Sequence, residues 1–187
     1  MSGPTFIECD RINLQTVEEE DIEFLQRGVN HPDVRHYIEA FRTPVNREQY
    51  RETFESIDSD EEGVTLLVVP DEDESEPIGS VQLYPINNAR GFANLGVWLM
   101  PEVWGNGYAT EASAYLLDYG FQQMGLHRIS AVSDSPNEAS TSLCERLGFA
   151  HEGTSRELGF SDGEYTDLER YGLLSDEWEG PEEILGQ

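Results

Sequence analysis

Apolar side chains between residues 22 and 57 recur at helical spacing in three short stretches, and each stretch predicts a helix with one apolar face. The three apolar sets are Ile22, Leu25 and Val29; Val34, Ile38 and Phe41; and Tyr50, Phe54 and Ile57. Thr16 followed by Glu19 predicts a capping box before the first helix, because the two side chains satisfy amide groups that a helix start leaves free. Two longer helices are predicted over residues 109–123 and 137–147, the second closed by Gly148.

Alternating or β-branched apolar runs predict the strands. They span Phe6–Leu14, Val64–Val69, Pro77–Ile86, Ala93–Met100, Arg128–Val132, Phe149–Glu157 and Tyr165–Leu174. Strands and helices in this order predict an α/β protein built on a mixed sheet. A length of 187 residues favours one domain, placed at residues 1–175, followed by a short acidic C-terminal tail at residues 176–187.

The charge balance adds a second prediction. The chain has 38 acidic and 11 basic residues, all of the latter arginine, and a formal net charge of -27. Because the acidic residues are spread along the chain, we expect adaptation to concentrated salt, where a Debye length of about 3 Å at 1 M screens self-repulsion. An acidic surface that attracts a basic partner is the alternative.

Other bulk features exclude several classes of protein. Cys9 and Cys144 lie far apart without metal-ligand spacing, so we expect two small buried side chains rather than a disulfide or ligands. The acidic stretch from Pro70 to Glu76 is predicted to be a solvated connection, since nothing makes its carboxylates converge on a metal. Neither a signal peptide nor a run of about 18 apolar residues is visible, so a cytoplasmic location is expected.

A glycine-rich turn separates the strand that ends at Met100 from the helix that starts near Ala109. Gly105 and Gly107 allow positive φ, so consecutive amide groups can point at one anion at the positive end of a helix dipole. The turn matches neither a Walker loop nor Gly-x-Gly-x-x-Gly. Spacing alone therefore leaves a structural turn and an anion site equally open.

Asn137 and Ser140 stand three residues apart at the start of a predicted helix. Leu143 and Leu147 continue the same inward face, which would aim Ser140 toward the sheet. A helix cap accounts for Asn137 without any further role, and Ser140 could equally be a plain polar residue of the first turn.

The run from Trp104 to Ala109 resembles the coenzyme A pyrophosphate loop of the Gcn5-related N-acetyltransferases (GNAT), in the branch similar to ribosomal-protein N-terminal alanine acetyltransferases. Two further motifs match in order and lie at Asn137–Ser140 with Leu147–Phe149, and at His151–Gly153 with Asp162–Tyr165. The resemblance covers most of residues 77–174. It implies a GNAT-like fold, in which a central, mostly antiparallel mixed sheet contains two splayed parallel strands and is flanked by helices.

The resemblance also implies acetyl-coenzyme A as co-substrate and direct attack of an amine on the thioester, without a covalent enzyme intermediate. The residues implied in holding coenzyme A are Leu99, Met100, Trp104, Gly105, Asn106, Gly107, Tyr108, Ala109, Thr110 and Asn137. Ser140 is the implied acid that protonates the leaving thiolate. Many members of the branch carry a glutamate where this chain has Asn94, two residues before the strand glycine.

Asparagine orients water but accepts no proton at neutral pH, so Asn94 leaves the general base open. A water chain to Glu152 or Glu164, an acceptor that arrives deprotonated, and lost catalysis are the three alternatives. The acceptor is expected to be a protein N-terminal amine, with a polyamine or antibiotic as alternative, and an acyl-coenzyme A sensor is the non-catalytic reading. No nucleic acid or membrane partner is expected, and a homodimer is one oligomeric state to test.

Overall fold

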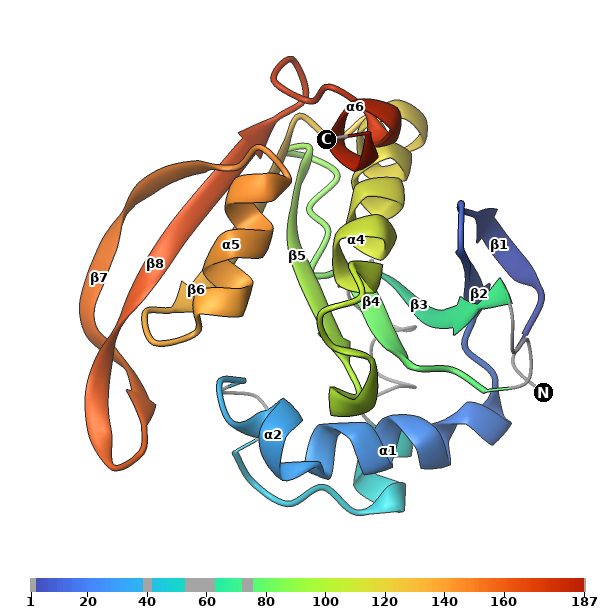
Figure 1. The fold of residues 1–187 in the computed structure, drawn as a ribbon, viewed down its shortest axis with the longest axis vertical. Coiled ribbons are helices and arrows are strands. Elements are labelled where there is room, and N and C mark those ends of the chain that lie inside the picture. The colour runs from blue at the N-terminus through green and yellow to red at the C-terminus, as the bar shows by residue number, and fades with distance from the viewer. Residues whose placement is uncertain (1–2, 39–41, 53–62, 72–75, 187) are drawn as a thin grey trace.

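The computed structural model describes residues 3–38, 42–52, 63–71 and 76–186. In these ranges one eight-stranded sheet has the order β1-β2-β3-β4-β5-β6-β8-β7 (Figure 1). The strands are β1 Thr5–Glu8, β2 Ile12–Thr16, β3 Val64–Pro70, β4 Gly79–Leu83, β5 Phe92–Leu99, β6 Arg128–Asp134, β7 Ala150–Ser161 and β8 Glu164–Leu174. The helices are α1 Ile22–Asn30, α2 Pro32–Arg35, α4 Tyr108–Asp118, α5 Glu138–Arg146 and α6 Pro181–Leu185.

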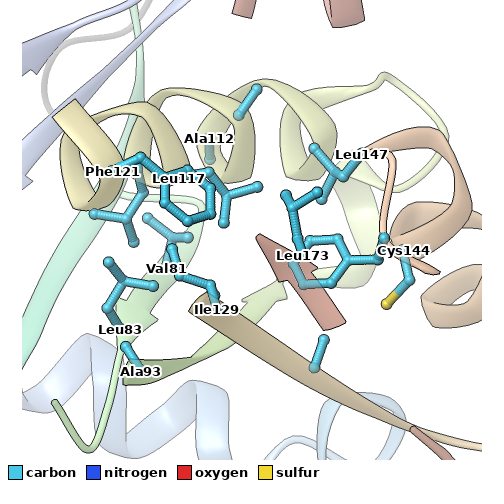
Figure 2. Packing of buried hydrophobic residues seen from close by; sticks show 14 of the residues in the cluster. Val81, Leu83, Ala93, Ala112, Leu117, Phe121, Ile129, Cys144, Leu147 and Leu173 are labelled. Atoms are coloured by element: carbon cyan, nitrogen blue, oxygen red, sulfur yellow. The ribbon is translucent and has the colours of Figure 1, made fainter. Parts of the chain in front are cut away.

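Alternation along β5 sends its side chains to two apolar layers, one on each face of the sheet. Ala93 and Leu99 belong to the larger cluster, which also contains residues of α4 and α5. Figure 2 shows this cluster, with Leu117 and Phe121 from the α4 side above Val81 and Ile129 of the strands. On the other face Trp98 stacks on Phe24 of α1, with ring centroids 5.7 Å apart.

The described strands contain one parallel pair, β5 and β6, and this pair separates along its length. The two strands pair only at Phe92–Arg128, Ala93–Ile129 and Asn94–Ser130. Beyond these residues β5 pairs only with β4, and β6 pairs only with β8. The expected mixed sheet with splayed parallel strands is therefore confirmed, and the unpaired edges at Leu95–Leu99 and Ala131–Asp134 are called the splay below.

Two predictions at the N-terminus were wrong. The stretch Phe6–Leu14 forms two antiparallel strands rather than one, because the chain reverses where the Cys9 amide donates to the Ile12 carbonyl at 3.2 Å. The capping box involves Glu18 and Asp21, not Thr16 and Glu19. Thr16 cannot cap because it is the last residue of β2, paired with Leu66 of β3.

The other elements differ from prediction mainly in their ends. The second predicted helix is only the single turn α2, with Ile38 beyond it and Phe41 outside the described residues. The third is helical over residues 47–52, while Phe54 and Ile57 lie outside the described ranges. The long helix stops at Asp118 and continues as a π-helical turn over Tyr119–Gln123. Strand β4 is shorter than predicted, whereas β6 runs two residues further, to Asp134.

The C-terminal segment packs against the body of the molecule. The residues expected as an acidic tail contain α6, whose Ile184 is buried, and the Trp178 indole donates to Asp118 at 3.1 Å. Both cysteines are free, and burial raises the pKa of the Cys144 thiol to about 11. Among the described helices, none has the length and apolar character needed to cross a membrane.

Candidate functional site

The turn before α4 presents a row of backbone amides without hydrogen-bond acceptors. Gly105 and Gly107 have φ angles of +79° and +82°, and Gly107 is the N-cap of α4 without any side-chain cap. Within the described parts of the chain, no acceptor is found for the amides from Gly105 to Thr110. Unpaired amides at a helix N-terminus form a favourable site for a phosphate group. The structure thus has the arrangement that the glycine spacing left open.

An ion pair beneath this turn was missed from the sequence. The Arg11 guanidinium donates to the Glu111 carboxylate from Nε at 2.8 Å, and the Arg11 backbone amide donates to the same carboxylate at 2.7 Å. Arg11 Nη1 also donates to the Asn106 carbonyl at 3.0 Å, and its guanidinium lies over the Tyr108 ring. Glu111 is 1% exposed, so the pair ties β2, the turn and the first turns of α4 together.

Leu99 faces the splay, whereas Met100 does not. The Met100 amide donates to the Ile78 carbonyl at 2.8 Å, toward β4. Successive strand residues direct their amides to opposite edges, so the Leu99 amide faces the unpaired edge. The Leu99 carbonyl accepts from the Trp104 indole at 2.8 Å, which places this half-exposed ring at the same edge. Of the two predicted strand residues, Leu99 alone has backbone groups turned toward the splay.

The start of α5 has the geometry expected for Asn137 and Ser140. The Asn137 side chain accepts from the Ser140 amide at 3.1 Å, so its capping role is confirmed. Leu147 is fully buried and Leu143 packs against the same cluster, which confirms the inward face on which Ser140 begins. Ser140 is half-buried at the N-terminus of the helix that follows the open end of β6.

Asn94 marks the closed end of the splay. It forms the last β5–β6 pair with Ser130, and its carbonyl accepts from the Tyr84 amide at 2.9 Å. Trp98 lies on the α1 face of β5, so alternation places Asn94 on that face too.

The two carboxylates named as alternative bases are poorly placed for that role. Glu152 is held by the Arg128 guanidinium through two hydrogen bonds, and this contact lowers the pKa of the carboxyl. Arg128 is the first residue of β6, so the pair lies at the closed end of the splay. Glu164 is exposed at the turn between β7 and β8.

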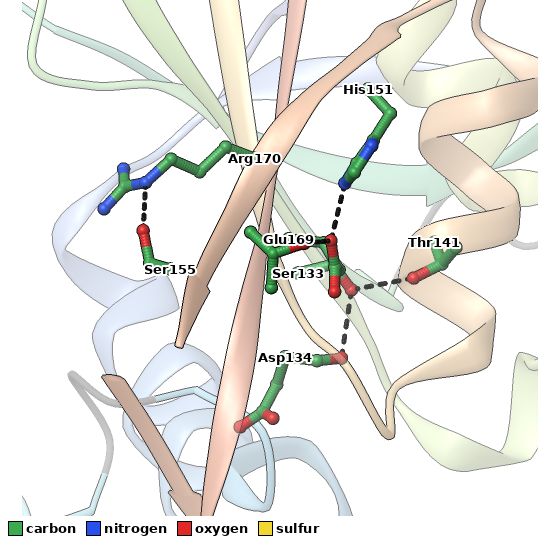
Figure 3. Close-up of polar contacts among 8 residues, drawn as sticks. Ser133, Asp134, Thr141, His151, Ser155, Glu169 and Arg170 are labelled. Atoms are coloured by element: carbon green, nitrogen blue, oxygen red, sulfur yellow. Dashed lines mark hydrogen bonds and ion pairs between the residues drawn. The ribbon is translucent and has the colours of Figure 1, made fainter. Parts of the chain in front are cut away.

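Polar contacts fix β6 against α5 and β7 against β8 (Figure 3). The Ser133 and Thr141 hydroxyls lie 3.3 Å apart and join β6 to α5. Glu169 accepts from Thr154 at 2.8 Å and contacts His151 at 2.5 Å, and these two contacts lower the pKa of its carboxyl. These contacts stabilise the strand and helix that carry the open end of the splay.

The tip of the β7–β8 hairpin meets the segment that follows α2. Arg42 donates to the Phe160 carbonyl at 2.6 Å, and His36 Nε2 lies 3.4 Å from Asp162 Oδ2. Figure 1 shows the hairpin, in orange and red, extending past α5 to the level of α2. The tip exposes three large apolar side chains, Leu158, Phe160 and Tyr165.

The structure therefore brings the turn residues, Leu99 and the Arg11–Glu111 pair to one end of β5, with Asn137 and Ser140 on the helix after β6. The sequence contained one signal for the missed pair. Glu111 is a charged residue between Thr110 and Ala112, on a helix whose other inward side chains are small or apolar. No group of three or more metal-binding side chains occurs among the described residues.

Comparisons with known proteins agree with this arrangement. A family model described as an acetyltransferase (GNAT) domain matches residues 11–150. A Bacillus subtilis protein named provisionally as a ribosomal N-acetyltransferase, YdaF, is 28% identical over 177 residues, which cover 91% of this chain and 95% of the relative. Spermidine N(1)-acetyltransferase of Escherichia coli (strain K12) is 27% identical over 178 residues, covering 94% and 92%.

A solved structure extends the likeness to the whole fold. Spermidine N-acetyltransferase from Vibrio cholerae, crystallised in complex with CoA and spermine, superposes with a TM-score of 0.81 at 26% identity. The match covers 89% of this chain and 97% of that chain.

Proposed function

Since the chain belongs to the GNAT family and is an acetyl-coenzyme A-dependent N-acetyltransferase, we propose that it acetylates the N-terminal amine of a protein. The assignment of coenzyme A binding rests on the row of unpaired amides from Gly105 to Thr110 at the start of α4. A diphosphate accepts hydrogen bonds from such a row and is stabilised by the helix dipole.

Each of the predicted site residues has its own role in this proposal. Gly105, Asn106, Gly107, Tyr108, Ala109 and Thr110 hold the pyrophosphate, and Trp104 packs beside it. The Leu99 backbone binds the pantetheine arm and polarises the thioester carbonyl, which stabilises the oxyanion that develops there. Met100 contributes by packing, since its amide is already bonded. Ser140, positioned by Asn137, protonates the leaving thiolate, and Asn94 orients water at the closed end.

The acceptor is proposed to lie between the β7–β8 hairpin tip and the segment after α2. Leu158, Phe160 and Tyr165 give this tip an exposed apolar surface suited to side chains of a peptide. The relative named for ribosomal N-acetylation supports the same class.

A polyamine is the second candidate. The net charge of -27 attracts any polycation, and the Escherichia coli and Vibrio cholerae relatives are named spermidine acetyltransferases. The charge alone does not separate the two candidates, because a peptide N-terminus is also cationic.

A turnover assay with matched acceptors separates these candidates. Acetyl transfer from acetyl-coenzyme A is measured in concentrated salt with peptides starting in alanine or serine, the same peptides with a blocked N-terminus, spermidine and spermine. A higher kcat/KM for the free-N-terminus peptides supports the proposal. Preference for spermidine selects the second candidate, and coenzyme A binding without turnover on any amine contradicts an active transferase and favours the sensor.

Three further proposals concern the whole protein. We propose that it is adapted to concentrated salt, because the chain contains 38 acidic residues but only 11 arginines and no lysine. A cytoplasmic location and a homodimer remain predictions, for which cell fractionation and light scattering at high salt are the measurements.

A further inference from the structure

Asp134 is the last residue of β6, at the open end of the splay. The edge of β6 that faces β5 is unpaired beyond Ser130, while its other edge stays paired with β8 as far as Asp134 and Leu168. The Asn137 amide donates to the Asp134 carbonyl at 2.8 Å, which fixes this residue directly before α5. The Asp134 backbone is therefore held by its pairing with β8 and by the Asn137 amide, shortly before Ser140 in the chain.

The side chain of Asp134 lies on the face that carries Asn94. Asn94 pairs with Ser130, and the β6–β8 register contains no bulge from Arg128 to Asp134. Side chains two residues apart share a face, so Ser130, Val132 and Asp134 follow one another on the α1 face of the sheet. Figure 3 shows the Asp134 carboxylate turned away from Thr141 and α5.

The carboxylate is buried and incompletely bonded. Asp134 is 6% exposed, and its Oδ1 has no hydrogen-bond partner among the described residues. The Thr166 hydroxyl of β8 is buried without a partner in the same set. A Cβ placed on Gly159 would lie 2.4 Å from that hydroxyl and 3.1 Å from Asp134 Oδ2, so both groups border the space that this glycine leaves free. Buried polar groups are almost always bonded, and a ligand is one explanation for the exception.

We propose that the Asp134 carboxylate receives the ammonium group of the acceptor and accepts its proton, as the general base of acetyl transfer. This inference rests on the proposed function. Asp134 takes one proton from the ammonium, and the neutral nitrogen attacks the thioester carbonyl carbon. The carbon–nitrogen bond forms and the carbon–sulfur bond breaks. The nitrogen loses a second proton, the thiolate takes up one proton to give the coenzyme A thiol, and the proton on Asp134 passes to solvent.

Asp134 supplies the proton-accepting carboxylate that Asn94 lacks. Both side chains are on the α1 face of the splayed strands, and only Asp134 carries a carboxylate. Glu152 is bound by Arg128, Glu164 is exposed at the hairpin tip, and the buried Glu111 is bound by Arg11. Among the described residues at the open end, Asp134 is therefore the buried carboxylate that no arginine compensates. The Thr166 hydroxyl can share the ammonium, since a hydroxyl accepts as well as donates.

Asp134→Asn tests the proposal because it keeps the shape and removes the base. The matched control is Asp176→Asn, which removes the same charge at an exposed position beyond the other end of β8. Circular dichroism and coenzyme A affinity establish that each variant is folded. With the best acceptor of the panel, we expect kcat of Asp134→Asn to fall by about 100-fold or more, with coenzyme A affinity unchanged. Asp176→Asn keeps the wild-type kcat.

A measurement of amine binding tests the role of Asp134 without turnover. Spermidine and an alanine-starting peptide are titrated into coenzyme A-saturated protein by calorimetry, and we expect about 10-fold weaker binding of the preferred amine to Asp134→Asn. Gly159→Ala, which fills the space beside the carboxylate, should lower kcat while coenzyme A still binds. Unchanged kcat and unchanged amine binding in Asp134→Asn would overturn the assignment. If wild-type protein acetylates no amine, the proposed function fails, and equal amine binding by both proteins then also rejects Asp134.

Discussion

Gly107 has a backbone conformation that side chains rarely adopt, at the position where α4 begins. Its φ is +82°, and a Cβ there would lie 3.4 Å from Arg11 Nη2. A β-branched residue would turn the amides of the row away from a shared anion. We expect Gly107→Val to weaken coenzyme A binding by about 10-fold or more, given a strain of about 1–2 kcal/mol and the lost phosphate contacts. Calorimetry measures the affinity.

The control for backbone strain is Gly125→Val. Gly125 has a φ of +68° with no atom within 4 Å of an added Cβ, and it follows the π-helical turn rather than the phosphate turn. It should lose stability while coenzyme A affinity stays at the wild-type level. Equal affinities in the two folded variants would contradict the placement of the pyrophosphate.

Arg11 and Glu111 are predicted to act as one unit beneath the same turn. Glu111 is buried, and Arg11 supplies the positive charge that compensates it. Arg11 is half-exposed and Glu111 is buried, so removal of the Arg11 side chain costs less than breaking a fully buried pair, about 1–3 kcal/mol. We expect Arg11→Met to lower the free energy of unfolding by about this amount and to weaken coenzyme A binding, because Asn106 loses its contact.

A double-mutant cycle separates the pair from its members. Glu111→Gln removes the buried charge, so the double variant should be more stable than the sum of the single effects predicts. Urea unfolding supplies the four free energies. Additive losses would show that the two side chains act independently.

At the scale of elements, α1 packs tightly on β5. A Cβ on Gly28 would lie 2.1 Å from Trp98 Cη2, so this glycine lets the helix sit directly on the indole. We expect Gly28→Ala to cost about 1–3 kcal/mol by overpacking, and to lower acceptor turnover more than coenzyme A affinity because α1 precedes the acceptor segment. Thermal unfolding and steady-state kinetics measure the two effects. Glu23→Ala, exposed on the same helix, should change neither.

The link between β6 and β7 predicts a dependence on pH. Arg128 crosses β8 at Gly172, where a Cβ would lie 2.4 Å from Nη2, to reach Glu152. The contact lowers the pKa of Glu152 below its ordinary value of 4.5. The stabilisation is therefore complete above the unfolded pKa and is lost as pH falls through the folded pKa. At high salt, Glu152→Gln should flatten the acid limb of stability against pH, whereas exposed Glu145→Gln should leave the limb unchanged.

The sequence predicted elements well where local patterns agreed with tertiary contacts. Asn137, followed by the face of Leu143 and Leu147, defined α5 correctly because cap and core face lie in one stretch. The Thr16 capping box was wrong because pairing of Thr16 with β3 outweighed a local preference. Where a local sequence pattern competed with strand pairing, the tertiary contacts therefore determined the structure.

The candidate site was predictable only where its residues are adjacent in sequence. The turn from Gly105 to Thr110 could be inferred because its glycines and helix start are contiguous. Arg11 and Glu111 are distant in sequence, and their contact depends on the β2 register. Asp134 was missed because β6 ends two residues later than its apolar run predicts, and its burial comes from β7 and β8.

At the scale of the whole molecule, the net charge makes stability depend on salt. A net charge of -27 on 187 residues opposes folding through self-repulsion, and salt screens this repulsion within a Debye length of about 10 Å at 0.1 M and 3 Å at 1 M. We expect far-UV circular dichroism to show loss of structure on dialysis to very low salt, and the melting temperature to rise with added KCl.

The form of the salt dependence distinguishes two causes. Repulsion between distant charges is mostly removed once the Debye length is below about 10 Å, so simple screening should level off near 0.1–0.2 M. Adaptation to concentrated salt predicts stabilisation that continues to about 1 M and beyond, because only there are neighbouring carboxylates, closer than 10 Å, screened from one another. Full structure at very low salt would contradict both. Coenzyme A binding should follow the same curve, because its phosphates must approach a negative protein and the amide row at α4 can bind them only when that repulsion is screened.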